Sequence, residues 1–231
     1  QGAKTLFIDM DPQAQVTQWL KAGDGLPSDG TIVRVMAGHH PLPQIIQSTP
    51  IENLSFVASA EGLEELGRQI TDNETYPTIL ARSLASDELK DFQFVVIDSP
   101  NQISPIMENA IYPTDVFIVP FESTKAVRSY ANFYKLLVRL RSEPDYHILH
   151  VLSNLTRQNG LRQRVIEIME ADGIPRAKTE VRSCGWLAQV DEHGGSIFHY
   201  RPHANGAVDM ANLLDEVLTL LGHQRDPVAI P

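Results

Sequence analysis

Short apolar runs alternate with longer amphipathic segments along most of this chain. Five runs of four to six residues, rich in β-branched and aromatic side chains, are typical of parallel strands buried on both faces: residues 5–8, 54–57, 94–97, 116–119 and 147–152. The segments between and after them predict helices over residues 78–90, 103–110, 126–142, 161–171 and 207–221. This alternation predicts an α/β fold with a doubly wound, mostly parallel sheet and helices on both faces.

Two of the expected helices have clear end signals. Ser123 or Thr124 is placed to cap the helix that follows, because a hydroxyl at this position accepts a hydrogen bond from a free backbone N–H. Gly173 ends the helix over residues 161–171. Residues 23–50, rich in Gly, Pro, Ser and His, predict a loop with one short helix near residues 31–37. We expect one α/β domain over residues 1–222 and a frayed tail at 223–231.

The composition argues against several classes of protein. The longest apolar runs are about six residues, far below the roughly 20 that span a bilayer. The single cysteine, Cys184, excludes an internal disulfide and fits a reducing cytoplasm. A net charge of −10 argues against a protein that coats nucleic acid over its whole surface. Residues 157–182 are nevertheless locally basic, with six Arg or Lys against four carboxylates.

Two of the predicted strands end in acidic residues. Asp9 and Asp11 close the strand within residues 4–10, and Asp98 closes the strand that begins at residue 94. Ligands of open α/β sheets bind outside the carboxyl ends of the strands, so these acids are expected to converge on one crevice. An apolar strand that ends in aspartate is the usual form of a magnesium-site acid in ATPases. The alternative is that each acid only forms a turn.

Several segments, in the same order along the chain, resemble the ParA/MinD-type P-loop ATPases, and the ParA partition ATPases most of all. The segment LFIDMDPQAQ is similar to their LLIDLDPQGN, NLSFVAS to NLDLIPS, FQFVVIDSP to YDYIIIDTPP, and AIYPTDVFIVP to NALTAADEVIIPV. Residues 190–200 resemble the family's A-x-x-x-G-K-P-I-x-x-Y segment, and residues 206–217 resemble its final helix. No single segment is specific to this family, but the ordered set of segments is.

The resemblance implies ATP and Mg²⁺ as cofactors and assigns roles to individual residues. Asp11 matches the catalytic aspartate that orients the attacking water, and Asp9 matches its neighbour on the same strand. Asp98 matches the acid that holds Mg²⁺, commonly through water. Asn154 falls near the position at which relatives place a residue against the adenine, although an asparagine at a strand end is also a common turn residue.

The chain also departs from the family pattern. Ala14 stands where the family has glycine, and Ser99 and Asn101 stand in its D-T-P-P motif. The phosphate-binding loop, G-x-x-x-x-G-K-S/T, is absent from the sequence. The family places that loop about thirty residues before the strand of residues 4–10, after a central strand of the sheet. We expect the natural protein to carry this segment upstream of Gln1, the alternative being a diverged pseudo-ATPase that never had it.

The resemblance further implies non-specific DNA binding by an ATP-dependent homodimer through basic residues in the C-terminal third. The matching residues are Arg157, Arg162, Arg164, Arg176, Lys178, Arg182 and Arg201. The alternative is that they form ordinary solvated faces. The tail after Gly222 lacks the amphipathic helix by which MinD relatives bind membranes, so we expect no membrane attachment. One cysteine cannot supply the cluster ligands of the iron-protein branch.

These features together predict a cytoplasmic, nucleoid-associated ATPase that positions or segregates plasmid or chromosomal DNA with a ParB-like adaptor protein. Two alternatives stay open. One is a catalytically inactive DNA-binding or scaffold relative. The other is a ParA-like ATPase that positions a protein assembly.

Overall fold

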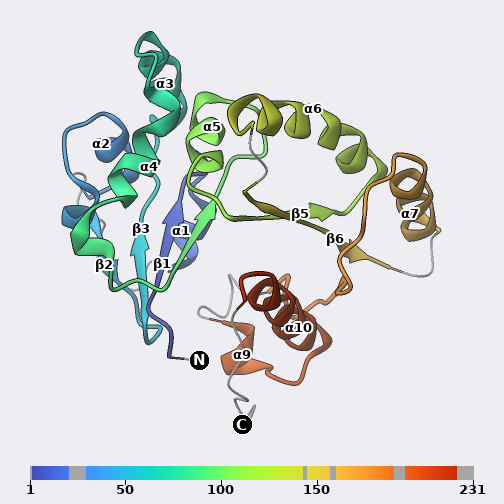
Figure 1. Ribbon diagram of the computed structural model, residues 1–231. Coiled ribbons are helices and arrows are strands. Elements are labelled where there is room, and N and C mark those ends of the chain that lie inside the picture. The colour runs from blue at the N-terminus through green and yellow to red at the C-terminus, as the bar shows by residue number, and fades with distance from the viewer. Residues whose placement is uncertain (1, 21–29, 143–144, 157–159, 190–195, 223–231) are drawn as a thin grey trace. The chain divides into compact units, whose positions relative to one another are not determined.

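Two sheets, one in each half of the chain, organise the computed structural model (Figure 1). The structure describes residues 2–20, 30–142, 145–156, 160–189 and 196–222. The chain divides into two compact units at Thr114 and Asp115. The prediction of a single domain stays a prediction.

The first unit contains a four-stranded sheet in the order β2-β3-β1-β4. Its strands are β1 (Thr5–Asp9), β2 (Gln47–Ser48), β3 (Leu54–Val57) and β4 (Phe94–Asp98). β1 pairs in parallel with both β3 and β4, and β2 runs antiparallel to β3. The helices of this unit are α1 (Gln15–Leu20), α2 (Ile32–Met36), α3 (Leu63–Gln69), α4 (Ile79–Leu84) and α5 (Pro105–Ile111). Short 3₁₀ turns lie at Leu42–Ile45, Ile70–Asp72, Tyr76–Thr78 and Asp87–Leu89.

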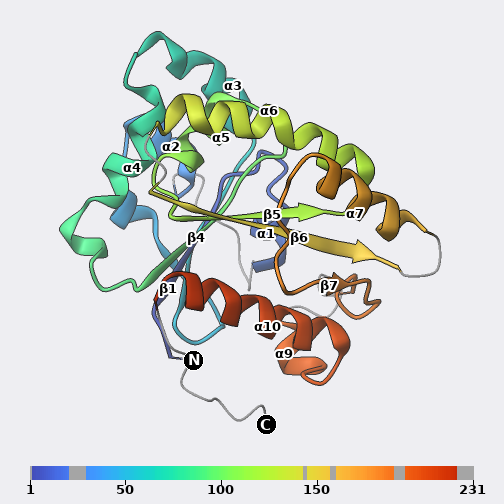
Figure 2. The ribbon, with the colours of Figure 1, turned by 45° about the vertical axis from the view of Figure 1, so that its right-hand side comes forward.

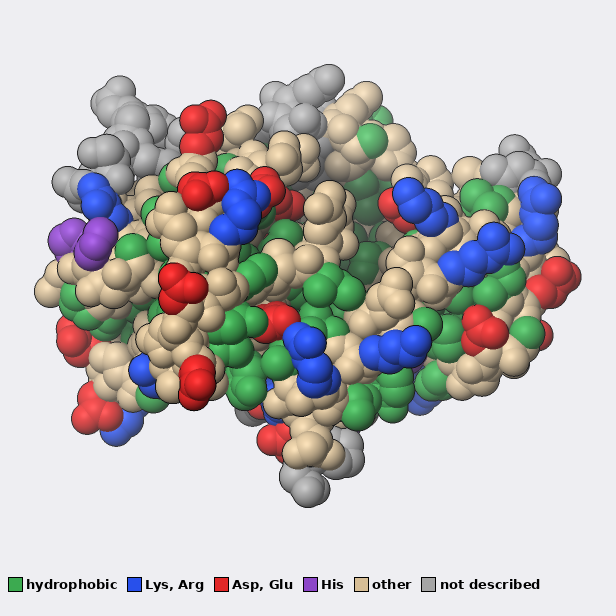
Figure 3. Space-filling model, turned by 90° about the horizontal axis from the view of Figure 1, so that it is seen from above, with side chains coloured by type: hydrophobic (Ala, Val, Ile, Leu, Met, Phe, Trp, Pro, Cys, Tyr) green, Lys and Arg blue, Asp and Glu red, His purple; other side chains and the backbone are tan. Residues whose placement is uncertain are grey.

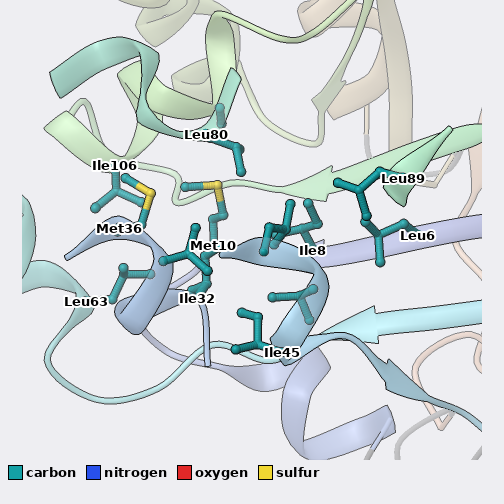
Figure 4. Close-up of a cluster of buried hydrophobic side chains, with 14 residues drawn as sticks. Leu6, Ile8, Met10, Ile32, Met36, Ile45, Leu63, Leu80, Leu89 and Ile106 are labelled. Atoms are coloured by element: carbon teal, nitrogen blue, oxygen red, sulfur yellow. The ribbon is translucent and has the colours of Figure 1, made fainter. Parts of the chain in front are cut away.

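Alternate residues of β1 enter two different cores, as the pleat of a strand requires. Leu6 and Ile8 are fully buried in a cluster with residues of α2, α3, α4 and α5, which Figure 4 shows around Met10. Phe7, on the opposite side of the strand, packs into a second cluster with Phe56 and residues of α1. Helices therefore cover both faces of this sheet.

The second unit contains a three-stranded parallel sheet in the order β5-β6-β7. Its strands are β5 (Val116–Phe121), β6 (His147–Leu155) and β7 (Val181–Arg182). Its helices include α6 (Thr124–Leu140), α7 (Leu161–Ala171), α9 (Ile197–Tyr200) and α10 (Asn205–Leu220). The Ser123 hydroxyl caps α6 by accepting from the N–H of Ala126, and Gly173 follows α7 with a φ of 67°.

This second sheet also carries helices on both faces, as Figures 1 and 2 show for α6 and α10. Leu152 and Leu155 of β6 pack with residues of α6 and α7, whereas Leu149 and Val151 pack against residues of α10. Leu152 and Leu155 share a cluster although they are three residues apart. The register of β6 shifts between Ser153 and Leu155, and such a bulge reverses the side to which later residues point.

The structure confirms the predicted α/β fold of parallel strands with helices on both faces. The short helix near residues 31–37 and the helix over residues 161–171 lie where they were expected. The helix predicted over residues 78–90 is shorter, because Ser86 adopts an extended backbone and separates α4 from the turn that follows. α1 and α3 were not predicted.

One expectation about burial was wrong. Residues 94–97 and 116–119 were expected to be buried on both faces, yet Val95, Val96 and Ile118 are 39%, 47% and 50% exposed. The cause is the position of their strands. β4 and β5 are outer strands of their sheets in the described part of the chain, so neighbours cover them on one side only.

Within the part of the chain that the structure describes, no helix is both long enough and apolar enough to cross a membrane.

Candidate functional site

Parallel pairing brings the acidic ends of β1 and β4 together. Asp9 and Asp98 are register partners across the two strands, and the N–H of Met10 donates to the Asp98 carbonyl at 2.8 Å. Asp11 follows two residues after Asp9 and is partly buried. The predicted convergence of the three acids at the carboxyl ends of the strands therefore occurs in the structure.

Asp9 is fully buried, and backbone and side-chain donors surround its carboxylate. One oxygen, Oδ2, accepts from the Thr17 N–H at 2.8 Å and from the Thr17 hydroxyl at 2.6 Å. The other oxygen accepts from the N–H of Asp11 at 3.0 Å. With this burial and these partners, Asp9 ties the start of α1 to the end of β1 and is not placed to contact a ligand directly.

The same network extends to the end of β3 through Ser59. The Thr17 hydroxyl accepts from the Ser59 N–H at 2.9 Å, and the Ser59 hydroxyl donates to the Asp11 carbonyl at 2.7 Å. Asp11 itself accepts from the N–H of Gln13 through one carboxylate oxygen, at 2.9 Å. Thr17 and Ser59 were missed from the sequence, because only the folded chain brings residues 42 positions apart into contact.

Burial and neighbouring charge raise the pKa of two acids of this site, Asp98 and Asp9. Burial, together with the negative charges of Asp9 and Asp11, raises the pKa of Asp98 to about 6. Burial also raises the pKa of Asp9, although the hydrogen bonds from Thr17 and Asp11 oppose the shift. Carboxylates that raise one another's pKa in this way favour a bound cation, which stabilises their ionised form.

The loop between the acids and α1 carries backbone strain at Ala14. Its φ is 52°, in the left-handed region that a side chain with a Cβ disfavours by roughly 1–2 kcal/mol. Its N–H donates to the Asp11 carbonyl at 2.9 Å, and its carbonyl accepts from the N–H of Gln18. The turn that holds Asp11 thus has a glycine-type conformation at a position occupied by alanine.

The carboxylates at the ends of β1 and β4 fit a magnesium ion that takes most of its ligands from water and phosphate. Among the residues that the structure describes, no group of three His, Cys, Asp or Glu side chains is arranged to hold a metal ion. Mg²⁺ usually keeps several waters and takes only one or two carboxylates from a protein, which the half-buried Asp98 supplies. A pocket of about 410 Å³ in the first unit lies elsewhere, against residues of α2 and α4.

Asn154, proposed from the sequence to lie against adenine, occupies the bulge of β6. Its φ is 54° and its side chain is exposed. Asparagine tolerates this left-handed conformation better than most residues, which is a structural reason for its presence here. Asn154 belongs to the second unit and the three acids to the first, so its role at a nucleotide stays a prediction.

Most of the basic residues proposed to bind DNA have partners within the second unit. Arg162 pairs with Glu180, and Arg182 donates to the carboxylate of the buried Asp209. The Arg201 guanidinium lies 4.3 Å from the centre of the Trp186 ring. Arg176 lies within 4 Å of two glutamates, Glu170 and Glu180.

The remaining residues of that set differ in placement. Arg164 and Lys178 are exposed and make no ion pair among the described residues. Arg157 lies outside the described residues.

Comparisons with known proteins find a matching family model and several relatives of this chain. A family model described as an AAA domain, AAA_31, matches residues 1–148. The chain is 27% identical to the cell division protein PomZ of Myxococcus xanthus, over 95% of this chain and 70% of PomZ. It is 24% identical to the sporulation initiation inhibitor protein Soj of Bacillus subtilis, over 94% of this chain and 87% of Soj.

Solved structures support the same fold. An ATP complex of Cyanothece McdA, carrying an aspartate-to-alanine substitution, superposes with a TM-score of 0.82 at 21% identity. The superposition covers 99% of this chain and 88% of McdA. At this identity the likeness shows the fold alone.

Proposed function

The chain belongs to the ParA/MinD-type P-loop ATPases, within the AAA_31 family, and we propose that it hydrolyses ATP at the carboxyl ends of β1 and β4 to position a cargo. One observation carries the proposal. Asp9 and Asp98 face each other in register, with Asp11 two residues further on, so three acids meet at the strand ends where α/β proteins bind ligands.

Each acid has a separate task in this proposal. Asp11, on the partly exposed loop, orients the attacking water, and Asp98 holds Mg²⁺ through water. When bound, Mg²⁺ supplies the positive charge that stabilises the phosphate oxygens during transfer. Asp9 is a positioning residue, because its buried carboxylate accepts from the N–H of Asp11 and from Thr17.

The proposed cargo cycle is an analogy with the ParA-type relatives. We propose that ATP drives homodimerisation, that the dimer associates with non-specific DNA, and that a ParB-like adaptor protein stimulates turnover. Support comes from Soj and PomZ, whose similarity spans most of this chain. Arg164, Lys178 and Arg201 of the original basic set are exposed and make no ion pair among the described residues, and Arg201 lies against the Trp186 ring.

A second candidate function has one specific observation in its favour. PomZ is named a cell division protein, not a partition protein. A cargo made of protein is therefore a candidate beside a plasmid or chromosome. Co-purification from cells carrying the complete gene separates the two, because a protein cargo survives nuclease treatment whereas a DNA cargo does not.

Substitution of Asp11 tests the chemistry. In the protein expressed from its complete gene, Asp11→Ala should abolish ATP hydrolysis and leave the affinity for ATP within about threefold, because water orientation matters for the reaction and not for binding. Asp91→Ala, which removes an exposed carboxylate paired with Lys4, is the matched control and should keep wild-type turnover. Unchanged hydrolysis in Asp11→Ala would remove the basis of the proposal.

A further inference from the structure

Helix α6 is basic throughout, in a chain that is acidic overall. Its 17 residues contain no Asp or Glu, whereas the whole chain has 29 acidic and 19 basic residues. Four cations lie on it: Lys125, Arg128, Lys135 and Arg139. By contrast, the charged residues of α10, the other long helix of this unit, are all acidic. The charge of α6 is therefore a local feature and not the average of the surface.

The four cations form a stripe along one side of the helix. At 100° per residue, positions 125, 128, 135 and 139 fall within a sector of roughly 80°. All four residues are exposed, and the buried Leu137 lies on the opposite side. At 1.5 Å per residue the stripe is about 21 Å long. Figure 3 shows the molecule from above, with Lys and Arg side chains, and Asp and Glu among them, on the face that it draws.

Neither helix stability nor internal pairing explains this stripe. Lys125 lies in the first turn, where the helix dipole disfavours a cation by a few tenths of a kcal/mol or more, and no acid compensates it there. Among the described residues, Lys125, Arg128 and Lys135 make no ion pair. Arg141, just past the helix, does pair, with Asp145. Lys125, Arg128 and Lys135 are therefore available to a ligand outside the unit.

We propose that the α6 stripe binds the phosphodiester backbone of duplex DNA without regard to sequence. A linear array of cations matches a polymer that carries one negative charge per roughly 1.7 Å of axis. A protein partner is the weaker fit, because the stripe itself contains no aromatic anchor and two of its four cations are Lys, which protein interfaces deplete. The inference rests on the proposed function for its DNA-associated state, but it assigns that contact to residues outside the set that the family resemblance indicated.

Neutralising the stripe tests the proposal. The protein from the complete gene, with ATP and Mg²⁺, is titrated against a fluorescein-labelled 24-bp duplex of arbitrary sequence between 50 and 200 mM NaCl, and anisotropy is read. The double variant Arg128→Gln/Lys135→Gln should bind roughly 10- to 60-fold more weakly at 100 mM salt, with a salt slope reduced by about 2. Glutamine favours helix almost as well as Lys and Arg do, so circular dichroism should be unchanged.

A matched control removes two cations elsewhere. Arg68→Gln/Lys90→Gln neutralises residues that pair with Glu64, Glu65 and Asp87 in the first unit, and should bind DNA within about twofold of wild type. Equal loss in both double variants would mean that net charge alone acts and would overturn the α6 assignment.

Two further measurements separate this inference from the proposed function. If Arg164→Gln/Lys178→Gln weakens DNA binding while the α6 variant does not, the α6 stripe is refuted and DNA association stands. If wild type hydrolyses ATP but does not bind the duplex, the inference and the DNA step both fail while the ATPase assignment stands. If poly-L-glutamate competes as well as DNA at equal charge, the partner is an acidic protein and the proposal is overturned.

Discussion

Replacing Thr17 with valine tests whether the Asp9 network holds the site together. Valine has the same shape as threonine but cannot donate to Asp9 or accept from Ser59, so the substitution removes bonds of 2.6 and 2.9 Å in a buried place. A hydrogen bond to a charged group contributes about 1.5–3 kcal/mol, and a buried N–H left unsatisfied costs about 1–3 kcal/mol. Because one hydroxyl serves both, we expect a loss of about 3 kcal/mol in the free energy of unfolding.

Thr17→Ser is the matched control, because it keeps the hydroxyl and removes one methyl group, which costs about 1 kcal/mol. The assay is equilibrium urea unfolding in a Trp186→Phe background, where Trp19 on α1 becomes the single tryptophan reporter.

Loss of the hydroxyl should also raise the pKa of Asp9 further, since the side-chain hydrogen bond from Thr17 lowers it. With a higher pKa, the Asp9 carboxyl of the folded variant binds a proton more readily at low pH than the wild-type carboxyl does. Proton binding by the folded state stabilises it. The deficit of Thr17→Val should therefore be smaller near pH 4 than at pH 7. A valine variant as stable as the serine variant at pH 7 would show that the network contributes nothing.

Three further substitutions probe other parts of the fold. Burial and the charges of Asp9 and Asp11 raise the pKa of Asp98 to about 6 from 3.8, so the folded state loses stability as pH rises from about 4 to 6. Asp98→Asn should remove that decline and raise the free energy of unfolding at pH 8 by about 1–3 kcal/mol in EDTA, whereas Asp91→Asn should not. Ala14→Gly should stabilise the fold by about 0.5–1 kcal/mol in urea unfolding, because relief of the left-handed φ exceeds the entropy cost of glycine; a loss of stability would contradict the strain. Gly206→Ala should destabilise by about 1–3 kcal/mol in the same assay, because a Cβ there would lie 2.6 Å from the Leu187 side chain, while Gly185→Ala has open space and should be neutral.

The strand ends were predictable because their signals are local. An apolar run followed by Asp at positions 9 and 98 marks both a strand and its carboxyl end, and the structure places the two acids in register. The cap at Ser123 and the glycine that ends α7 were likewise readable from neighbouring residues.

Long-range pairing was not predictable. The partners of Asp9 include Thr17, whose hydroxyl in turn accepts from Ser59, and Asp209 on α10 accepts from Arg182 on β7. No sequence pattern in the segment around any of these polar residues predicts its burial. The edge positions of Val95 and Ile118 also depend on strand order, which the apolar runs do not encode.

The outer position of β4 has a consequence for how this chain behaves in concentrated solution. Val95 and Val96 leave an apolar strand substantially exposed, and no described strand pairs with its outer edge, so its backbone groups there offer a template to a strand from another molecule. Strands of this kind, short, β-branched and without a charge in their middle, nucleate intermolecular sheets. Asp98 closes the strand at one end, but a single carboxyl with a pKa of about 6 becomes neutral on mild acidification and then no longer repels a second copy. When the 231-residue chain is expressed by itself, we therefore expect it to self-associate through β4 at high protein concentration below pH 6.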